Sequence, residues 1–140
     1  MDMTDIAGAW SVVSVVSEVG GKKSDLFGPS PRGQFIFTPD GHFSINIIRS
    51  GRKRFASNNS TTGTAEENKE AMAGALSLFG KCTLNSDGWQ TLYIIGSSFP
   101  NWDGAEQKRL VQIHGDEMRY ENPTAPTGSG HVVLMLRRAR

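Results

Sequence analysis

Residues 32–49 read RGQFIFTPDGHFSINIIR, two alternating apolar runs on either side of a short turn. Asp40-Gly41 within that turn is a dipeptide typical of tight β-hairpins. A three-residue loop at this point pairs Thr38 with His42. The stretch therefore predicts an antiparallel hairpin, and it is the strongest hairpin signal in the chain.

The register of this hairpin decides which side chains share a face of the sheet. With Thr38 opposite His42, Phe37 lies opposite Phe43 and Phe35 opposite Ile45. One face then collects the apolar side chains Phe35, Phe37, Phe43, Ile45 and Ile47. The other face is mostly polar, and a slip by one residue would mix the two. Arg49 falls on the apolar side, where the second strand ends.

Strand signals cover much of the remaining chain. A nearly continuous run of valines predicts a first strand over 10–19 that is covered on both faces. The other predicted strands span residues 81–84, 89–95, 107–114, 117–121 and 131–138. Hairpin turns separate several of them, at residues 85–88 and at Gly115-Asp116.

The turn at Gly115-Asp116 fixes a second register. A two-residue loop pairs Ile113 with Met118 and Val111 with Tyr120. Gln107 and Arg109 share the parity of these apolar residues, so we expect both side chains on the apolar side. Buried Gln and Arg side chains cost several kcal/mol unless a partner or ligand bonds them.

One segment carries helical signals. Thr64 and Glu67 fit a capping box, and acidic residues occupy the first turn. Ala71, Met72, Ala75, Leu76 and Phe79 then follow at helical spacing, and Gly80 ends the pattern. We expect one helix over about 65–79, with this stripe packed in the core.

About eight strands and one helix, joined by short sequential hairpins, predict an all-β protein, mainly antiparallel, built as an up-and-down β-barrel. A chain of 140 residues fits one domain, so we expect a single domain over residues 1–140. The sequence leaves the oligomeric state open, and a homodimer is one of the alternatives.

Charge and apolar runs exclude several classes of protein. The net charge is +1, with 15 basic and 14 acidic residues, which argues against a nucleic-acid partner. No apolar run approaches the roughly 20 residues of a membrane span, so no membrane partner is expected. The acidic N-terminus lacks a secretory signal, and we expect a cytoplasmic protein. Because Cys82 is the single cysteine, an internal disulfide is excluded. We expect Cys82 to be a buried, inert thiol.

No motif indicates a cofactor or a metal. The chain has no glycine-rich nucleotide-binding loop, and His42, His114 and His131 are scattered singly. A nucleophile elbow is absent, and Cys82 has no neighbouring base. We therefore expect neither a cofactor nor a metal ion.

Several segments together resemble the lipocalin-like domain family, small intracellular proteins of one domain. The segments are Gly8-Ala9-Trp10, Gly28-Pro29-Ser30-Pro31-Arg32-Gly33, Phe37-Thr38-Pro39-Asp40-Gly41, Arg54-Phe55-Ala56, Ser98-Phe99-Pro100-Asn101-Trp102 followed by Gln107 and Arg109, and Arg137-Arg138. They cover nearly the whole chain in the family's order. Leu136 departs from the pattern, since the family often has Trp before its closing arginines.

The resemblance implies an antiparallel barrel with an internal cavity, but no single activity. Polar residues are expected along that cavity: Arg49, Tyr93, Asn101, Trp102, Gln107, Arg109 and Tyr120. A structural explanation is also open, in which Arg109 pairs with Asp103 or Glu121 and Trp102 plugs a barrel end. A set of hydrogen-bonding groups along one wall is what an orienting pocket requires.

The sequence leaves three hypotheses for the function. One is a filled barrel that has only a structural or interaction role, and the other two use the cavity. The first is binding of a small hydrophobic or aromatic molecule, with polar groups orienting a carbonyl, enolate or carboxylate. Its candidate ligand-binding residues are Phe35, Phe37, Phe43, Ile45, Arg49, Phe99, Asn101, Trp102, Gln107 and Arg109. The second is a cofactor-independent isomerase or cyclase acting on a secondary-metabolite-like substrate. There Arg109 would stabilise an oxyanion, and Tyr93, Tyr120 or His42 would move a proton.

Overall fold

The computed structural model describes residues 1–125 and 130–139. The strands are β1 (Gly8–Val19), β2 (Lys22–Asp25), β3 (Arg32–Phe37), β4 (His42–Ile48), β5 (Ala75–Leu84), β6 (Trp89–Ser97), β7 (Glu106–His114), β8 (Glu117–Ala125) and β9 (Gly130–Arg138). Two α-helices, α1 (Met3–Ile6) and α2 (Ala65–Ala73), and a short 3-10 helix, η1 (Pro100–Trp102), complete the described elements. None of these helices is long and apolar enough to cross a membrane.

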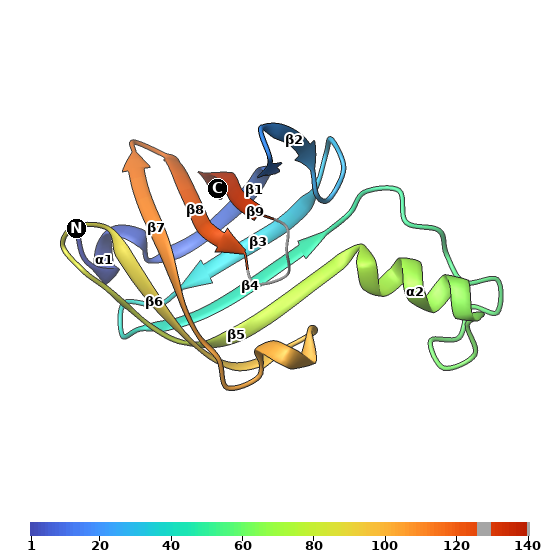
Figure 1. Cartoon of the computed structure of the whole chain (residues 1–140). Helices are drawn as coiled ribbons and strands as arrows, with labels where there is room; N and C mark the ends of the chain where they lie inside the picture. Colours follow the sequence, from blue (N-terminus) through green and yellow to red (C-terminus); the bar gives the residue numbers. More distant parts are fainter. Residues whose placement is uncertain (126–129, 140) are drawn as a thin grey trace.

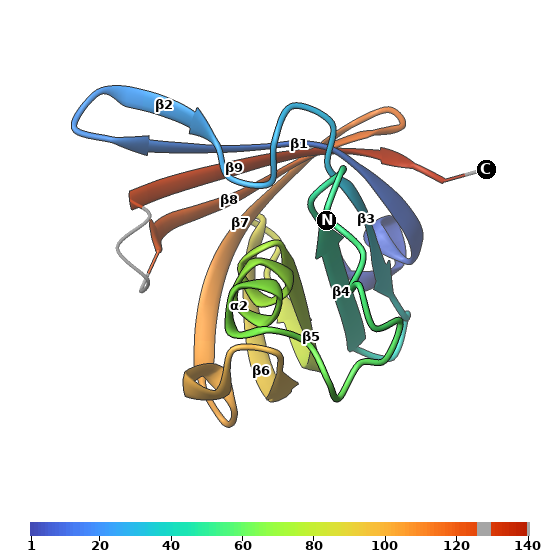
Figure 2. The ribbon, with the colours of Figure 1, turned by 90° about the vertical axis from the view of Figure 1, so that its right-hand side faces the viewer.

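The strands form a closed antiparallel barrel (Figures 1 and 2). From β3 to β9 each strand pairs with its sequence neighbour, and β1 pairs with both β3 and β9 to close the wall. The short strand β2 is additional and pairs with the end of β1. The predicted fold class, an eight-stranded up-and-down barrel, is confirmed, and β2 is the strand that the sequence did not indicate.

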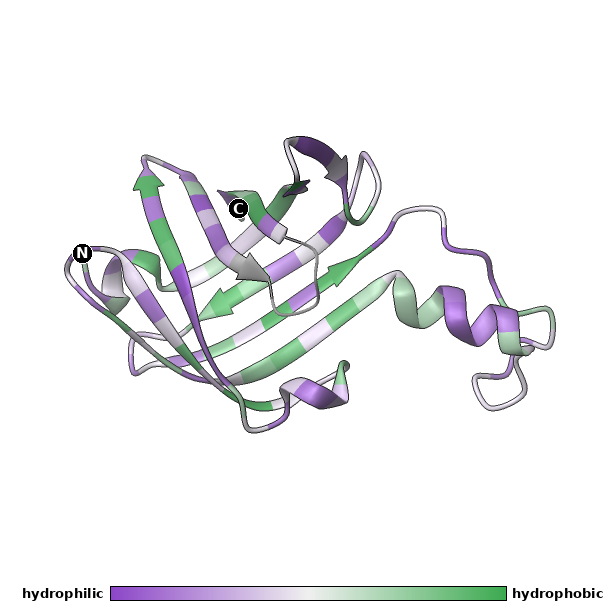
Figure 3. Cartoon of the chain, viewed as in Figure 1, coloured by the Kyte–Doolittle hydropathy of each residue, from purple (hydrophilic) through white to green (hydrophobic). Residues whose placement is uncertain are grey.

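Both predicted hairpin registers are confirmed. Phe37 pairs with Phe43 across β3 and β4, and the Thr38 backbone N–H donates to the His42 carbonyl oxygen at 2.9 Å. Across β7 and β8, Ile113 pairs with Met118. Figure 3 shows hydrophobic and hydrophilic residues alternating along the strands, as expected for a wall with a buried and a solvated face.

Strand β1 corrects the prediction that both of its faces are covered. Val13 is 49% exposed, whereas Val12 and Val15 are buried. The pairing of β1 with β9 shifts register between Val12 and Ser14. This irregularity turns both Val12 and Val15 inward although they are three residues apart, because the extra residue resets the alternation.

The helix begins where the sequence predicts and ends earlier. Thr64 caps α2 in a reciprocal capping box with Glu67. The helix stops at Ala73, and residues 75–84 form β5, so the prediction of a helix to residue 79 with a core stripe is wrong. No residue of α2 is buried, and Phe79 is 51% exposed on the outer face of β5.

Pairing with β4 explains why this segment extends. Leu76, Leu78 and Cys82 are separated by even numbers of residues, so they fall on one face of a strand, whereas only Leu78 and Cys82 also fit a helical spacing. Residues 75–81 of β5 pair with the whole length of β4. Gly80 is not a helix stop but a point of close approach: a Cβ there would lie 2.1 Å from the Tyr93 carbonyl oxygen. Tertiary pairing has overridden local helix propensity.

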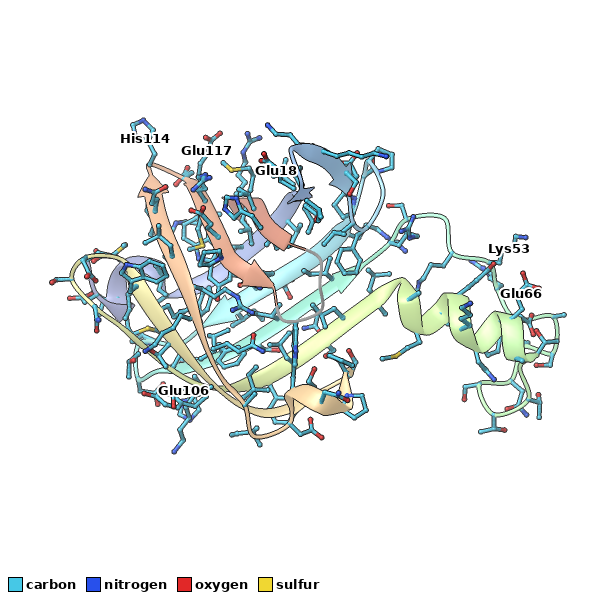
Figure 4. All side chains as sticks on the ribbon, viewed as in Figure 1. Glu18, Lys53, Glu66, Glu106, His114 and Glu117 are labelled. Carbon is cyan, nitrogen blue, oxygen red and sulfur yellow. The ribbon has the colours of Figure 1, made fainter. Side chains whose placement is uncertain are left out.

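The segment between β4 and β5 projects from one end of the barrel as an arm, residues 50–73 (Figure 1). A hydrogen bond from the Arg49 N–H to the Gly74 carbonyl, at 2.8 Å, closes its base. Within the arm, Glu67 accepts from the Ala56 N–H. Lys53 and Glu66 lie far from the barrel wall (Figure 4). The outer part of the arm is therefore held by contacts within the arm, while Ser50 at its base donates to the Ser30 carbonyl.

The opposite end of the barrel is closed. Trp10 is fully buried there, and its indole N–H donates to the Ile6 carbonyl of α1 at 2.9 Å. The Arg138 guanidinium lies 4.2 Å from the Trp10 ring and donates to the carbonyl oxygens of Asp5 and Ala7. Cys82 is buried, as predicted, and burial raises its pKa to about 11, which suits an inert thiol.

Candidate functional site

A cavity of about 470 Å³ occupies the half of the barrel next to α2. Its walls are mainly aliphatic and aromatic, and they include the rings of Phe35, Phe99, Trp102 and Tyr120. The volume lies within the range of about 300–1,000 Å³ that small-molecule sites occupy. The interior is thus hollow at this end, unlike a barrel filled only for stability.

Three segments surround the outer part of the cavity. They are the loop after β2 with Leu26 and Phe27, the end of α2 with Met72 and Ala73, and the β6–β7 connection with η1. In that connection the Phe99 and Trp102 rings meet edge to face, with centroids 5.6 Å apart. Apolar side chains therefore frame the entrance as well as the walls.

Arg109 brings a positive charge into this apolar cavity. It is only 7% exposed and lines the cavity from β7. Its guanidinium donates to the Lys108 carbonyl at 2.8 Å and to Gln107 Oε1 at 2.5 Å, both neutral oxygens. Burial lowers the pKa of Arg109, as expected for a cation taken out of water.

The two carboxylates considered as partners of Arg109 are engaged elsewhere. Asp103 accepts from the Ser97 N–H at 2.8 Å. Glu121 bonds Arg119 and His131 on the outer face. The structural explanation by an Arg109 ion pair with either group is wrong, because no ion pair joins Arg109 to a carboxylate within residues 1–125 and 130–139.

Polar side chains on neighbouring strands flank Arg109. Gln90 of β6 is its partner in the sheet register, and Asn122 of β8 follows the last β7–β8 pair and lines the cavity. The Tyr120 hydroxyl donates to Gln90 Oε1, and burial raises the pKa of Tyr120. Gln90 is fully buried, and its Nε2 has no hydrogen-bond partner within residues 1–125 and 130–139.

Sequence reasoning missed Gln90 and Asn122. Gln90 shares the period-two spacing of Leu92 and Ile94, which are buried, so the alternation held a usable signal. That signal was ambiguous because Trp89, Tyr93 and Ile95 form an equally apolar set on the other parity. The sequence assigned no side-chain role to Asn122, which sits beyond the predicted end of its strand.

The structure brings part of the predicted set together. Six of the candidate residues line the cavity: Phe35, Ile45, Phe99, Trp102, Arg109 and Tyr120. Gln107 does not line it but supports Arg109 through the hydrogen bond above. Phe37 and Phe43 are buried, yet they pack in the closed half. Asn101 is exposed on η1.

Three further polar candidates lie outside the cavity. Tyr93 is 44% exposed because β6 turns Leu92 and Ile94 inward, which corrects the expectation of a lumen tyrosine. His42 is exposed at the β3–β4 turn, where Nδ1 lies 3.2 Å from Asp40 Oδ1. Arg49 is exposed at the base of the arm and donates to the Leu26 carbonyl at 3.0 Å. His114 and Glu117 likewise extend from a turn, away from the interior (Figure 4).

Comparison with known proteins agrees with this architecture. A family model for a lipocalin-like domain matches residues 7–139, nearly the whole chain. The chain belongs to the lipocalin-like domain family. Among solved structures, this lipocalin-like chain is similar to a redesigned beta barrel, with a TM-score of 0.52 and 15% sequence identity over 99% of this chain and 95% of that one. That likeness shows the fold alone. No curated protein matches the chain.

The lipocalin-like barrel is a scaffold that supports small-molecule binding. Its described residues include no group of three or more His, Cys, Asp or Glu side chains placed to hold a metal ion. What the site offers chemically is an apolar, aromatic-walled space with one buried cation and neighbouring amide and hydroxyl groups.

Proposed function

We propose that this protein binds a small hydrophobic or aromatic molecule in the barrel cavity, with Arg109 holding an oxygen of that molecule. The oxygen belongs to a carbonyl, an enolate or a carboxylate. The observation that carries the proposal is the buried guanidinium of Arg109, which has only neutral partners among the described residues and lines a hollow space. A buried cation without an anion is costly, and a ligand oxygen offsets that cost.

The walls supply the rest of the affinity. Phe35, Phe99, Trp102 and the aliphatic residues around them favour an apolar body, since burial of apolar area contributes about 25 cal/mol per Å². The hydrogen bond from a charged donor adds about 1.5–3 kcal/mol and fixes orientation. The apolar walls thus supply most of the affinity and the one polar anchor supplies the specificity, as in most small-molecule sites.

The cavity lining supports binding more than the alternative, a cofactor-independent isomerase or cyclase. Its titratable side chains among the described residues are Arg109 and Tyr120. Burial raises the pKa of Tyr120, and its hydroxyl already donates to Gln90, so it is a poor base near neutral pH. Catalysis would need the substrate itself to supply a base.

Calorimetric titration tests the proposal with three molecules of one shape: naphthoate, acetylnaphthalene and ethylnaphthalene, substituted at the same ring position. The wild-type protein should bind the two oxygen-bearing molecules at least about tenfold tighter than the hydrocarbon, since tenfold corresponds to about 1.4 kcal/mol. Arg109→Gln should remove this preference while the hydrocarbon still binds.

Lys108→Gln is the matched control, because Lys108 carries the same charge on the outer face of the same strand. It should keep the wild-type preference. Leu76→Trp, which fills the outer part of the cavity, should weaken binding of all three molecules. The proposal fails if none of the three binds saturably to wild type, or if the oxygen preference survives in folded Arg109→Gln.

A further inference from the structure

We propose that the molecule held in this cavity is a planar phenol or enol, and that the protein holds it as its oxyanion beside Arg109. This inference rests on the proposed function and adds two things, the acid class of the ligand and its charge when bound. It follows from the charge balance inside the barrel and from the aromatic walls around Arg109.

The interior carries a net positive charge at Arg109. The hydrogen bonds of this guanidinium go to the Lys108 carbonyl and to Gln107 Oε1, neither of which neutralises it. Burial disfavours the charged form, yet a guanidinium keeps its proton in proteins at ordinary pH. The positive charge therefore stays in a space of low dielectric until a counter-charge enters.

The residues that the structure describes do not provide that counter-charge. On the inner face of β5 to β8, the titratable side chains are Cys82, Arg109 and Tyr120. Burial raises the pKa of Cys82 to about 11 and raises that of Tyr120 as well, so both are neutral near pH 7. The anion that balances Arg109 has to arrive with the ligand.

Donors on the cavity wall can hold an anionic oxygen of the ligand. Among the described residues, the polar side chains of this wall are Ser98, Arg109, Tyr120 and Asn122. The Tyr120 hydroxyl is directed to Gln90, and Arg109 uses two N–H donors on the Lys108 carbonyl and Gln107 Oε1. A guanidinium has five N–H donors, so Arg109 keeps donors for an anion, and Asn122 adds its amide. The acid class of the ligand then follows from the walls around these donors.

The shape and polarity of the walls favour a flat, conjugated anion. Phe35 and Tyr120 meet edge to face in the wall, with centroids 5.1 Å apart, and Phe99 with Trp102 repeats this arrangement at the entrance. Aromatic faces and edges contact planar rings well. A phenolate or enolate spreads its charge over such a plane, so it loses less hydration on entering the apolar cavity than a carboxylate does.

The consequence is a change in the acidity of the bound molecule. An opposite charge within hydrogen-bond reach lowers the pKa of an acid by about 1–3 units. On binding, the ligand O–H bond breaks, its electron pair stays on the oxygen beside Arg109, and the proton passes to solvent water. No group of the protein changes its protonation in this step.

Umbelliferone tests the inference, because its phenol and phenolate forms absorb at different wavelengths. Its methyl ether herniarin has the same shape and cannot ionise. Spectrophotometric pH titration of saturated complexes should show the pKa of bound umbelliferone about 1–3 units below that of the free dye in wild type. In Arg109→Gln the bound dye should ionise at or above its free pKa, because the apolar walls then favour the neutral form.

Two variants separate charge from fold. Arg109→Lys keeps a cation and should retain a lowered pKa of the bound dye, whereas Lys108→Gln changes an outer-face charge and should match wild type. If umbelliferone and herniarin bind but umbelliferone keeps its free pKa in wild type, this inference is overturned and the proposed function stands. If neither dye binds wild type saturably, the proposed function is contradicted as well.

Discussion

The half of the barrel near α1 is filled with side chains, whereas the half towards α2 surrounds a cavity of about 470 Å³. In the filled half Trp10, Phe37, Phe43 and Met118 are at most 4% exposed. On β3 and β4, the residues two positions away from Phe37 and Phe43 are Phe35 and Ile45, and these line the cavity. Helix α1 covers one end, while α2 projects from the other (Figure 1). The position of a residue along the strand thus decides whether its side chain packs in the core or lines the cavity.

Each half contains an arginine, and their surroundings differ. Arg138 at the closed end stacks on Trp10, donates to two backbone carbonyls and lies 3.9 Å from Asp116. Arg109 in the open half has two neutral acceptors and no carboxylate among the described residues. The surroundings of Arg138 suit a structural role, while the unbalanced charge of Arg109 is the basis of the proposed ligand contact.

The largest expected effect lies in the filled half. Trp10→Ala removes a fully buried ring and the support for Arg138, so the free energy of unfolding should fall by about 3–5 kcal/mol. Urea denaturation followed by circular dichroism measures the loss. Trp89→Ala is the control, because Trp89 is 36% exposed, and it should cost much less. Equal losses for the two variants would contradict the contrast between filled core and surface.

The two arginines should respond to the same substitution with opposite signs. Arg138→Met loses a cation–π contact and leaves the carbonyl oxygens of Asp5 and Ala7 without this donor. The free energy of unfolding should therefore fall by about 1–3 kcal/mol. Denaturant titration of this variant beside wild type measures the change, and an unaltered midpoint would show that the stacked arginine adds nothing.

Arg109→Met should stabilise the protein without ligand. It replaces an unbalanced buried cation with an apolar side chain of similar length, and the gain should be about 1–3 kcal/mol. The same variant should lose the preference for oxygen-bearing ligands, as expected where binding and stability conflict. A destabilised Arg109→Met would mean that the hydrogen bonds to Gln107 and Lys108 already compensate the charge.

The smallest expected effect concerns the outer face of β8. Burial by itself raises the pKa of Glu121, but hydrogen bonds from Arg119 and His131 lower it overall. The ionised Glu121 carboxylate therefore stabilises the folded protein at pH values above 4.5, the ordinary pKa of a glutamate. This stabilisation is lost as the pH falls from 4.5 towards the lowered pKa of Glu121 in the folded protein.

Denaturation of wild type and Glu121→Gln at about pH 7 and about pH 4 measures this contribution, expected at about 0.5–1 kcal/mol for a surface group. Wild type should lose more stability on acidification than the variant. Glu106→Gln, a change at an exposed glutamate on the outer face (Figure 4), should follow wild type. Identical acid profiles for wild type and Glu121→Gln would rule out a stabilising role for the pair.

Sequence reasoning succeeded where structure depends on near neighbours. The hairpin registers at Thr38–His42 and Ile113–Met118 follow from turn length and alternation, and both are confirmed. The start of α2 at Thr64 follows from a capping box that spans one helical turn. The inward parity of Arg109 also followed from alternation, counted back from a well-defined turn.

The failures occurred where a local pattern fits two structures. Residues 75–79 satisfy both a helical and a strand period, and pairing with β4 selects the strand. Strand β6 is apolar on both parities, and pairing with β7 places Gln90 rather than Tyr93 inside. In each segment the choice depends on a partner that lies far away in the sequence.

The amino-acid sequence by itself determined an antiparallel barrel, its hairpin registers and a guanidinium on the inner face, because turns and alternation act over a few residues. Only the tertiary structure decided that no carboxylate of the described residues lies beside this guanidinium and that the surrounding half of the barrel is hollow. Both properties depend on which side chains from distant strands meet in the interior, and on which groups cover each end.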